Sequence, residues 1–499
     1  MAAREVRTRA GTVRGREDGG IAAFLGIPFA ESPVGERRLA APEPARPWDG
    51  VREAAAYGPP PPQSAGLGPF GREETATGDD WLTVNVWSPR PEAGAGLPVM
   101  VWLYGGAYLR GHTAESGYSG ARLAGSGVVV VTLNYRVGVE GFAQIDGAPA
   151  NRGLLDQVAA LRWVRDNVEG FGGDPGNVTV FGESAGAGSV AALLAMERAA
   201  GLFRRAIAQS VPGTYFSAEL AGDVTAAIAG ELGLRPVRAE LAAVPADELV
   251  AAGDAVTAKI GSYRRWGAVA HTPTPFSPVI DGDVLTRTPW EALEAGAARG
   301  VELITGHNRD EYRLFIVAGE KLGKVTEEEA ATALRVFGPG ADPAGAYRAA
   351  YPGAGAERLY ELVHSDWLFR MPSLRLADAQ VAGGGRAYAY ELTWPAPGLG
   401  GVMGSSHGLD VPLVLGTLDS ARFAMVLGAE PPAEAWALSE RFRTAWTSFA
   451  ATGDPGWPAY DTASRIVRVF DTDPADAPYP EEASRAIWEG HEFRALPLV

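Results

Sequence analysis

The sequence contains no cysteine among its 499 residues, and this absence excludes several kinds of chemistry. Without thiols the chain can form no disulfide, no thiolate nucleophile and no thiolate metal site. Histidine is also scarce, and the six histidines show no paired spacing of the kind that binds a metal ion. We therefore expect neither a metal nor any other cofactor.

Long apolar segments and a positive charge balance are missing as well. Residues 1–7 carry charges throughout and lack the apolar core of a secretory signal. No apolar run approaches the roughly 20 residues that a membrane-spanning helix needs. The formal net charge of −16 argues against nucleic acid or an anionic membrane as a partner. These features predict a cytoplasmic protein.

The most informative segment is 177–196, where a β-branched run, a Gly-x-Ser-x-Gly pentapeptide and an alanine-rich apolar stretch follow one another. This order predicts a strand, a tight turn and a helix, which is the setting of a nucleophile elbow. Gly182 and Gly186 leave room for the helix to pack against the strand. Ser184 then projects at the apex of the turn. The N–H of Ala185, at the start of the helix, can face a developing oxyanion.

The same glycines permit a second interpretation, because residues 186–191 fit the G-x-G-x-x-A fingerprint of dinucleotide-binding proteins. That fold needs an acidic residue about 20 positions further on, at the end of the next strand. The next expected strand is 204–210, and no acid lies between Glu197 and Glu219. The fingerprint also begins inside the expected helix. We therefore favour the nucleophile elbow.

A nucleophilic serine needs a base and an acid that orients the base. In the α/β-hydrolase arrangement the acid and then the histidine follow the serine along the chain. His407 fits best among the histidines, since it follows the strand-like run 387–394 and a glycine-rich loop. Another expected strand, 301–306, is followed by Asp310 and Glu311. Adjacent side chains point in different directions, so we expect only one of the two acids to reach His407.

A cradle for the oxyanion is suggested by the hydrophobic run 97–103, which opens through Tyr104 into Gly105 and Gly106. The N–H groups of these glycines can turn towards the serine. Paired glycines are common in ordinary turns, so this signal counts only beside Ser184.

Several longer strings carry a resemblance to a known family. They lie at 24–35, 80–87, 134–136, 155–164, 171–175 and 449–455. With the serine motif, they make the chain resemble a type-B carboxylesterase, a family that includes bacterial para-nitrobenzyl esterase-like enzymes and the animal cholinesterases. The bacterial branch fits best. The resemblance implies an α/β-hydrolase fold, with a large, mostly parallel central sheet flanked by helices and helical insertions over the active site. It also implies a single domain over residues 1–499.

The resemblance further implies a serine hydrolase that cleaves carboxylic esters through an acyl-enzyme intermediate. Carried over residue by residue, Ser184 is the nucleophile and His407 is the base. The orienting acid is then Glu311 rather than Asp310. The implied substrate is a small-molecule ester, with no cofactor, and we expect the enzyme to act as a monomer.

The resemblance also implies that the N–H groups of Gly105, Gly106 and Ala185 form the oxyanion hole. Tyr104 stands where the family usually has histidine. Because the donors belong to the backbone, we expect the cradle to survive this change with altered hydrogen bonding around it.

The resemblance also implies a buried polar network of Glu183, Ser210 and Asp410 that supports the catalytic residues. Asp410 stands where glutamate is common, and the shorter carboxylate is expected to alter that network. For Ser210, ordinary hydrogen-bonded structure is an equally good interpretation. Trp81 replaces a usual cysteine, so the disulfide of the family cannot form there.

Two other functions are open at this stage. The first is a non-catalytic binding protein on the same fold, like the neuroligins, but these typically lack the serine. The second is a hydrolase of amides, carbamates or lactones. Away from the site, we expect a helix over 154–168, irregular structure over 337–352 and 471–480, and a solvated helix face at Glu327, Glu328 and Glu329.

Overall fold

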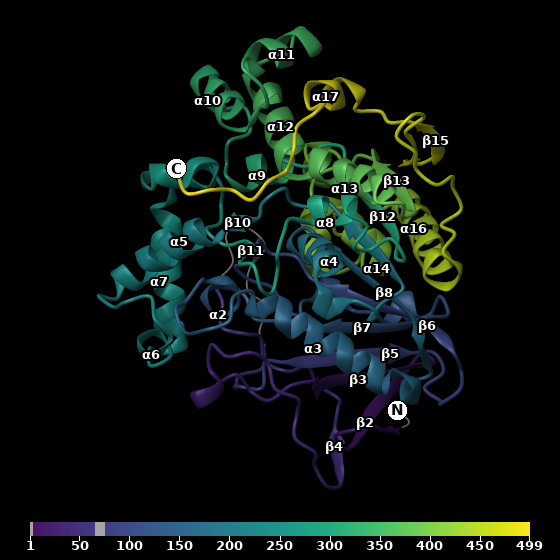
Figure 1. The fold of residues 1–499 in the computed structure, drawn as a ribbon. Helices are drawn as coiled ribbons and strands as arrows, with labels where there is room; N and C mark the ends of the chain where they lie inside the picture. Colours follow the sequence, from purple (N-terminus) through teal and green to yellow (C-terminus); the bar gives the residue numbers. More distant parts are fainter. Residues whose placement is uncertain (1–2, 65–74) are drawn as a thin grey trace.

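A large sheet forms the centre of the computed structural model, which describes residues 3–64 and 75–499 (Figure 1). Its strands run in the order β1-β2-β3-β5-β7-β6-β8-β9-β12-β13-β14-β15, and β4 pairs with β2. All pairings from β7 to β14 are parallel, whereas the main path is antiparallel towards both edges. A separate parallel pair is formed by β10 and β11.

The strands are β1 (Ala3–Arg7), β2 (Thr12–Asp18), β3 (Ile21–Pro28), β4 (Val51–Glu53), β5 (Thr83–Ser88), β6 (Leu97–Leu103), β7 (Val129–Leu133), β8 (Gly173–Glu183), β9 (Arg205–Gln209), β10 (Phe216–Ser217), β11 (Val279–Ile280), β12 (Glu302–Asn308), β13 (Ala387–Leu392), β14 (Ile466–Phe470) and β15 (Ala475–Pro478).

The helices are α1 (Ala121–Ala124), α2 (Gly138–Phe142), α3 (Arg152–Asn167), α4 (Ala185–Ala195), α5 (Ala218–Glu231), α6 (Arg238–Leu241), α7 (Ala246–Ala258), α8 (Pro289–Glu294), α9 (Arg313–Ala318), α10 (Glu327–Phe337), α11 (Pro343–Ala350), α12 (Ala356–Ser365), α13 (Met371–Ala382), α14 (Asp410–Leu415), α15 (Ala424–Leu427), α16 (Ala433–Thr452) and α17 (Glu482–Ile487).

Helices cover both faces of the central strands. Helices α3, α4, α8 and α13 pack on one another and on one face, while α14 and α16 lie on the other (Figure 1). A sheet covered on both sides needs continuous apolar strands, and every residue of β7 is buried accordingly. The helix expected at 154–168 is α3, whose apolar face includes the buried Leu154, Val158 and Leu161.

Two long insertions add helices beyond the sheet. The segment between β9 and β12 contains α5 to α8, and the segment between β12 and β13 contains α9 to α13. In Figure 1, α10 and α11 lie far from the central strands, and α5 to α7 form a group at one side. A π-helical turn, Asp366–Arg370, joins α12 to α13. Such turns are rare and often occur beside functional sites.

Two local expectations are wrong. The segment 337–352 contains α11, whose first turn is capped by the side chain of Asp342. The segment 471–480 contains β15, which pairs with β14. The acidic run 327–329 lies in a solvated part of a helix as expected, and it forms the first turn of α10, where its charges favour the helix dipole. No helix in the described ranges is long and apolar enough to cross a membrane.

Candidate active site

The residues singled out in the sequence gather at the carboxyl ends of five neighbouring strands. In spatial order, Gly105 follows β6, Ser184 follows β8 and Ser210 follows β9. Glu311 comes after β12, and His407 comes after β13. Open α/β sheets bind their ligands at this edge. The topology therefore brings together groups that lie up to 302 positions apart in the sequence, from 105 to 407.

Ser184 lies at a sharp turn between β8 and α4. Its φ of 57° and ψ of −124° are unusual for a residue with a side chain. The N–H of Gly188 donates to the Ser184 carbonyl at 2.9 Å and begins the helical hydrogen bonding. A Cβ on Gly186 would lie 2.0 Å from the carbonyl oxygen of Leu103, so this close approach of helix and strand requires glycine.

The loop after β6 runs beside the serine. A Cβ on Gly105 would lie 3.0 Å from the Cβ of Ser184 and 2.8 Å from Oε2 of Glu183. Directly after Gly106, Ala107 and Tyr108 have φ values of 57° and 58°, in the left-handed region. These conformations turn the loop back sharply, so that its backbone stays next to the serine.

Two tyrosines hold the start of this loop. Tyr104 and Tyr135 stack with their ring centroids 4.3 Å apart and their planes 13° apart. The Tyr135 hydroxyl donates to the Tyr104 carbonyl at 2.6 Å, and the Tyr104 hydroxyl donates to the Tyr135 carbonyl at 2.8 Å. A peptide group is planar, so fixing the Tyr104 carbonyl also fixes the N–H of Gly105. Tyr104 thus stabilises the loop through its contacts with Tyr135.

The imidazole of His407 is buried and held by an acid. Its Nδ1 lies 2.6 Å from Oε2 of Glu311, and its backbone N–H donates to the Glu311 carbonyl at 3.3 Å. Phe369, from the π-helical turn, stacks on the ring with a centroid distance of 4.1 Å, and Phe315 lies 5.5 Å away. Since a carboxylate only accepts hydrogen bonds, the short contact places the proton of the neutral ring on Nδ1.

The second oxygen of Glu311 is also fully engaged. Its Oε1 accepts from the Ser210 hydroxyl at 2.5 Å and from the backbone N–H of Asn308 at 2.8 Å. Three donors therefore hold the carboxylate plane, and rotation of the side chain would break all of these bonds. This contact is the structural reason for a hydroxyl at position 210.

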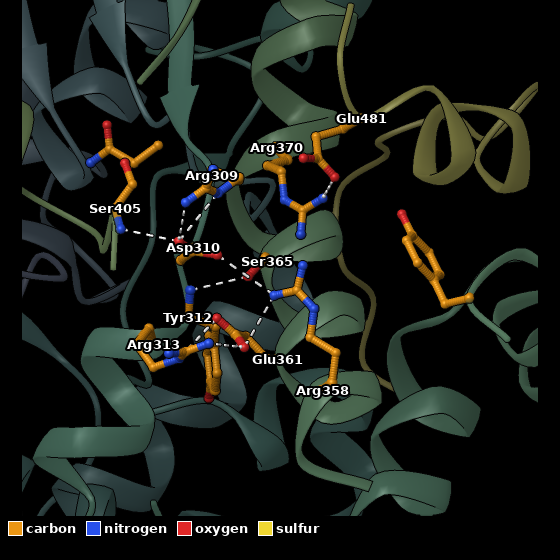
Figure 2. A network of polar contacts seen from close by, with 12 residues as sticks. Arg309, Asp310, Tyr312, Arg313, Arg358, Glu361, Ser365, Arg370, Ser405 and Glu481 are labelled. Atoms are coloured by element: carbon orange, nitrogen blue, oxygen red, sulfur yellow. Dashed lines mark hydrogen bonds and ion pairs between the residues drawn. The ribbon is translucent and has the colours of Figure 1, made fainter. Parts of the chain in front are cut away.

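Asp310 is held by partners other than the imidazole, and Figure 2 shows it among Ser405, Arg309 and Arg358. Its Oδ2 accepts from the Ser405 backbone N–H at 3.0 Å and lies 3.3 Å from the Arg309 guanidinium. Its Oδ1 lies 3.6 Å from Arg358. The Asp310 backbone N–H in turn donates to the Ser405 carbonyl at 2.8 Å. Asp310 therefore anchors the loop that precedes His407 instead of touching the ring.

Glu183 occupies the other side of the ring. Its Oε1 lies 3.1 Å from Nε2 of His407, and no hydrogen bond joins Ser184 to His407 in the part of the chain that the structure describes. Burial raises the pKa of Glu183 from 4.5 to about 8, against the opposing effect of His407. Burial lowers the pKa of His407, but Glu183 and Glu311 outweigh it and raise that pKa from 6.5 to about 9. The two carboxylates therefore favour the charged form of the ring.

Asp410 belongs to a neighbouring cluster. Its Oδ2 accepts from Gln209 Nε2 and from the Tyr390 hydroxyl, both at 2.8 Å, and burial raises its pKa. Asn308 lies 3.5 Å from its other oxygen and so links Asp410 to Glu311. Sequence reasoning missed Gln209, Asn308 and Tyr390. Gln209 and Asn308 are the last residues of β9 and β12, and that position is the signal that could have found them.

A cavity of about 590 Å³ opens over these groups, which is large enough for a substantial organic ligand. Ser184, Glu183 and His407 all line it. Most of its wall is apolar and includes Leu109, Leu314, Phe315, Ile316, Phe423 and Val426. The arrangement therefore offers a hydroxyl, a buried base and an apolar chamber in one place.

Comparison with known proteins identifies the family. A family model described as the carboxylesterase family matches residues 2–338 and 346–477. The chain belongs to the carboxylesterase family. It is 36% identical over 494 residues to the para-nitrobenzyl esterase of Bacillus subtilis (strain 168), covering 96% of the chain and 97% of that relative. It is 33% identical to the acetylcholinesterase of Bungarus fasciatus, covering 92% of this chain and 81% of that relative.

Solved structures agree with this assignment. A carboxylesterase of Geobacillus stearothermophilus superimposes with a TM-score of 0.85 at 38% identity, covering 97% of this chain and all of that one. A solved para-nitrobenzyl esterase gives the same TM-score at 35% identity. The expected α/β-hydrolase fold is therefore confirmed, and the protein is a carboxylic-ester hydrolase of the serine type.

Proposed function

We propose that Ser184, His407 and Glu311 are the catalytic triad of this carboxylesterase and that hydrolysis proceeds through an acyl-enzyme. The observation that carries the proposal is the 2.6 Å contact between Nδ1 of His407 and Glu311, on the same cavity as the turn that presents Ser184. That contact leaves the lone pair of Nε2 free to accept a proton.

The proton follows a simple path in this proposal. Nε2 of His407 takes the proton of the Ser184 hydroxyl as its oxygen attacks the ester carbonyl. The imidazolium then gives this proton to the departing alcohol, and the acyl group stays on the serine. A water molecule repeats the sequence and releases the acid. Glu183 must leave Nε2 available during each proton transfer. The hydrogen bond between Ser184 and His407 need not be formed beforehand, because catalytic hydrogen bonds are often long before substrate binds.

The oxyanion is stabilised by backbone donors in the same proposal. We assign this role to the N–H groups of Gly105, Gly106 and Ala185. The close approach of Gly105 to Ser184 and the location of Ala185 at the first turn of α4 support the assignment. Such donors act strongly because they are already oriented before charge develops.

The test combines a variant with a covalent label. Ser184→Ala is expected to lower kcat for p-nitrophenyl esters by at least about 10³-fold, as loss of a triad nucleophile does. Ser189→Ala is the matched control, since that hydroxyl lies on the same helix and contacts Gln157 at 3.0 Å. An organophosphate should label Ser184, as located by peptide mass spectrometry. Full activity of Ser184→Ala, or labelling at another residue, would refute the proposal.

A further inference from the structure

The guanidinium of one cation in the cavity has no partner among the residues that the structure describes. Arg110 follows the glycine loop by a single turn, is partly buried and lines the cavity together with Ser184. Its backbone N–H donates to the Gly106 carbonyl at 3.2 Å. Its guanidinium makes no hydrogen bond or ion pair with any residue in the ranges 3–64 and 75–499. Burial and the neighbouring Arg422 lower the pKa of Arg110, so its surroundings disfavour its charge.

The other arginine and the lysine of the cavity wall are already paired, as is the His407 ring with Glu311. Arg422 pairs with Glu115 and also lies over the Tyr118 ring, 5.3 Å from its centroid. Lys321 pairs with Glu329 at 2.9 Å. Glu115 attracts Arg110 through space, but Arg422 holds that carboxylate. The cavity therefore retains one uncompensated positive charge at Arg110.

An uncompensated charge in an apolar chamber is costly unless something binds to it. Guanidinium groups bind carboxylates with two parallel hydrogen bonds, which gives both energy and direction. The cavity of about 590 Å³ has room for an ester that carries a second functional group. A substrate carboxylate would supply the partner that the described residues do not provide for the Arg110 guanidinium.

We propose that Arg110 is a specificity-determining residue that selects esters carrying a second, negatively charged carboxylate. This inference rests on the proposed function, since it takes Ser184 to be the nucleophile of the same cavity. The ester bond is cleaved as above, and the remote carboxylate is bound by Arg110 without reacting. Neutral esters remain substrates but gain nothing from this contact.

The experiment compares two substrates that differ only in charge. One is the mono-p-nitrophenyl ester of suberic acid, and the other has a primary carboxamide in place of its free carboxylate. For the wild-type enzyme, kcat/KM is expected to be higher for the carboxylate ester. In Arg110→Met, the ratio of the two kcat/KM values should fall by roughly 10- to 100-fold, as the loss of a charge-assisted hydrogen bond implies.

Matched variants separate charge from shape. Arg110→Lys should retain part of the preference, because it keeps the charge but loses the planar pair of donors. Lys321→Met removes a cation of the same cavity that is already paired, so its ratio should stay within about twofold of the wild-type value. The preference should also weaken as salt is added.

The outcomes are distinguishable. Equal ratios in the wild type and Arg110→Met would overturn the assignment of Arg110 while leaving the triad intact. A wild-type ratio at or below one would overturn it as well, whether or not the variants fold. Failure of the wild type to release p-nitrophenolate from either ester, with no organophosphate label on Ser184, would instead refute the proposed function itself.

Discussion

Replacing Glu311 by glutamine tests the proposed triad most sharply, because the structure dictates how the amide must sit. Oε1 of Glu311 accepts from Ser210 and from the Asn308 N–H, so the oxygen of the glutamine must take that position. The NH₂ group then faces Nδ1 of His407, where the carboxylate oxygen lay at 2.6 Å. Facing a donor, Nδ1 must become the acceptor, and the ring proton moves to Nε2. That tautomer cannot take a proton from Ser184.

The magnitude follows from the cost of restoring the productive tautomer. Two buried donors would then face each other unpaired, at about 1–3 kcal/mol each. At 1.36 kcal/mol per factor of ten, the expected loss in kcat is roughly 30-fold to 3 × 10⁴-fold. The corresponding exchange in a serine protease, a different protein, costs about 10⁴-fold. Thermal stability should change little, because the bonds to Ser210 and Asn308 are kept.

The assay is steady-state hydrolysis of p-nitrophenyl butyrate, with a thermal melt of each variant. Asp310→Asn is the matched control, since an asparagine oxygen can still accept from the Ser405 N–H and the residue does not touch the ring. It should keep most of its kcat. A Glu311→Gln enzyme that retains more than about a tenth of wild-type kcat would refute the tautomer argument. A larger loss in Asp310→Asn would move the orienting role to Asp310.

Three further predictions follow from the same geometry. His407 must be neutral to act as base and its pKa is raised, so kcat/KM should rise with pH to a plateau with a midpoint above 6.5. Glu183→Gln should move that midpoint to lower pH. A profile that is flat between about pH 5 and 9 would contradict this. Tyr135→Phe should lower kcat by about tenfold with KM nearly unchanged, since it frees the carbonyl that orients an oxyanion donor; an effect on KM alone would contradict it. Gly186→Ala should lower the free energy of unfolding by at least about 1–3 kcal/mol, because its Cβ would clash at 2.0 Å with the Leu103 carbonyl oxygen. Gly222→Ala, which lies in open space on α5, should not lower the stability of the protein. Chemical denaturation measures both variants.

Much of the fold was predictable because its central strands have continuous apolar runs bounded by glycine. The expected strand at 97–103 is β6, and those at 301–306 and 387–394 match β12 and β13 within two residues at each end. The turn at Ser184 was predictable because its glycines have a steric purpose that the pentapeptide spacing reveals. Both the apolar strands and the glycines of the Ser184 turn are local sequence patterns, and each has a single physical cause.

The remaining features depend on contacts that no local pattern reports. Residues alone left Asp310 and Glu311 as alternatives, and the resemblance favoured Glu311. The structure turns Asp310 towards Ser405, far along the chain, and that contact is invisible in the sequence. The role of Tyr135 depends on Tyr104, in the loop after another strand. Helix α11 was not predicted, because the glycine and alanine content of this segment outweighed the helix N-cap that Asp342 provides.

Backbone strain is concentrated around the chemistry of this enzyme. Nine residues other than glycine have positive φ in the described ranges, and four of them, Ala107, Tyr108, Ser184 and Ser210, surround the active site. Each such conformation costs on the order of 1–3 kcal/mol and persists only because the surrounding structure enforces it. Stability and activity therefore oppose each other at these positions. Attempts to make the enzyme more heat-resistant should leave them unchanged and look for gains in the peripheral helices.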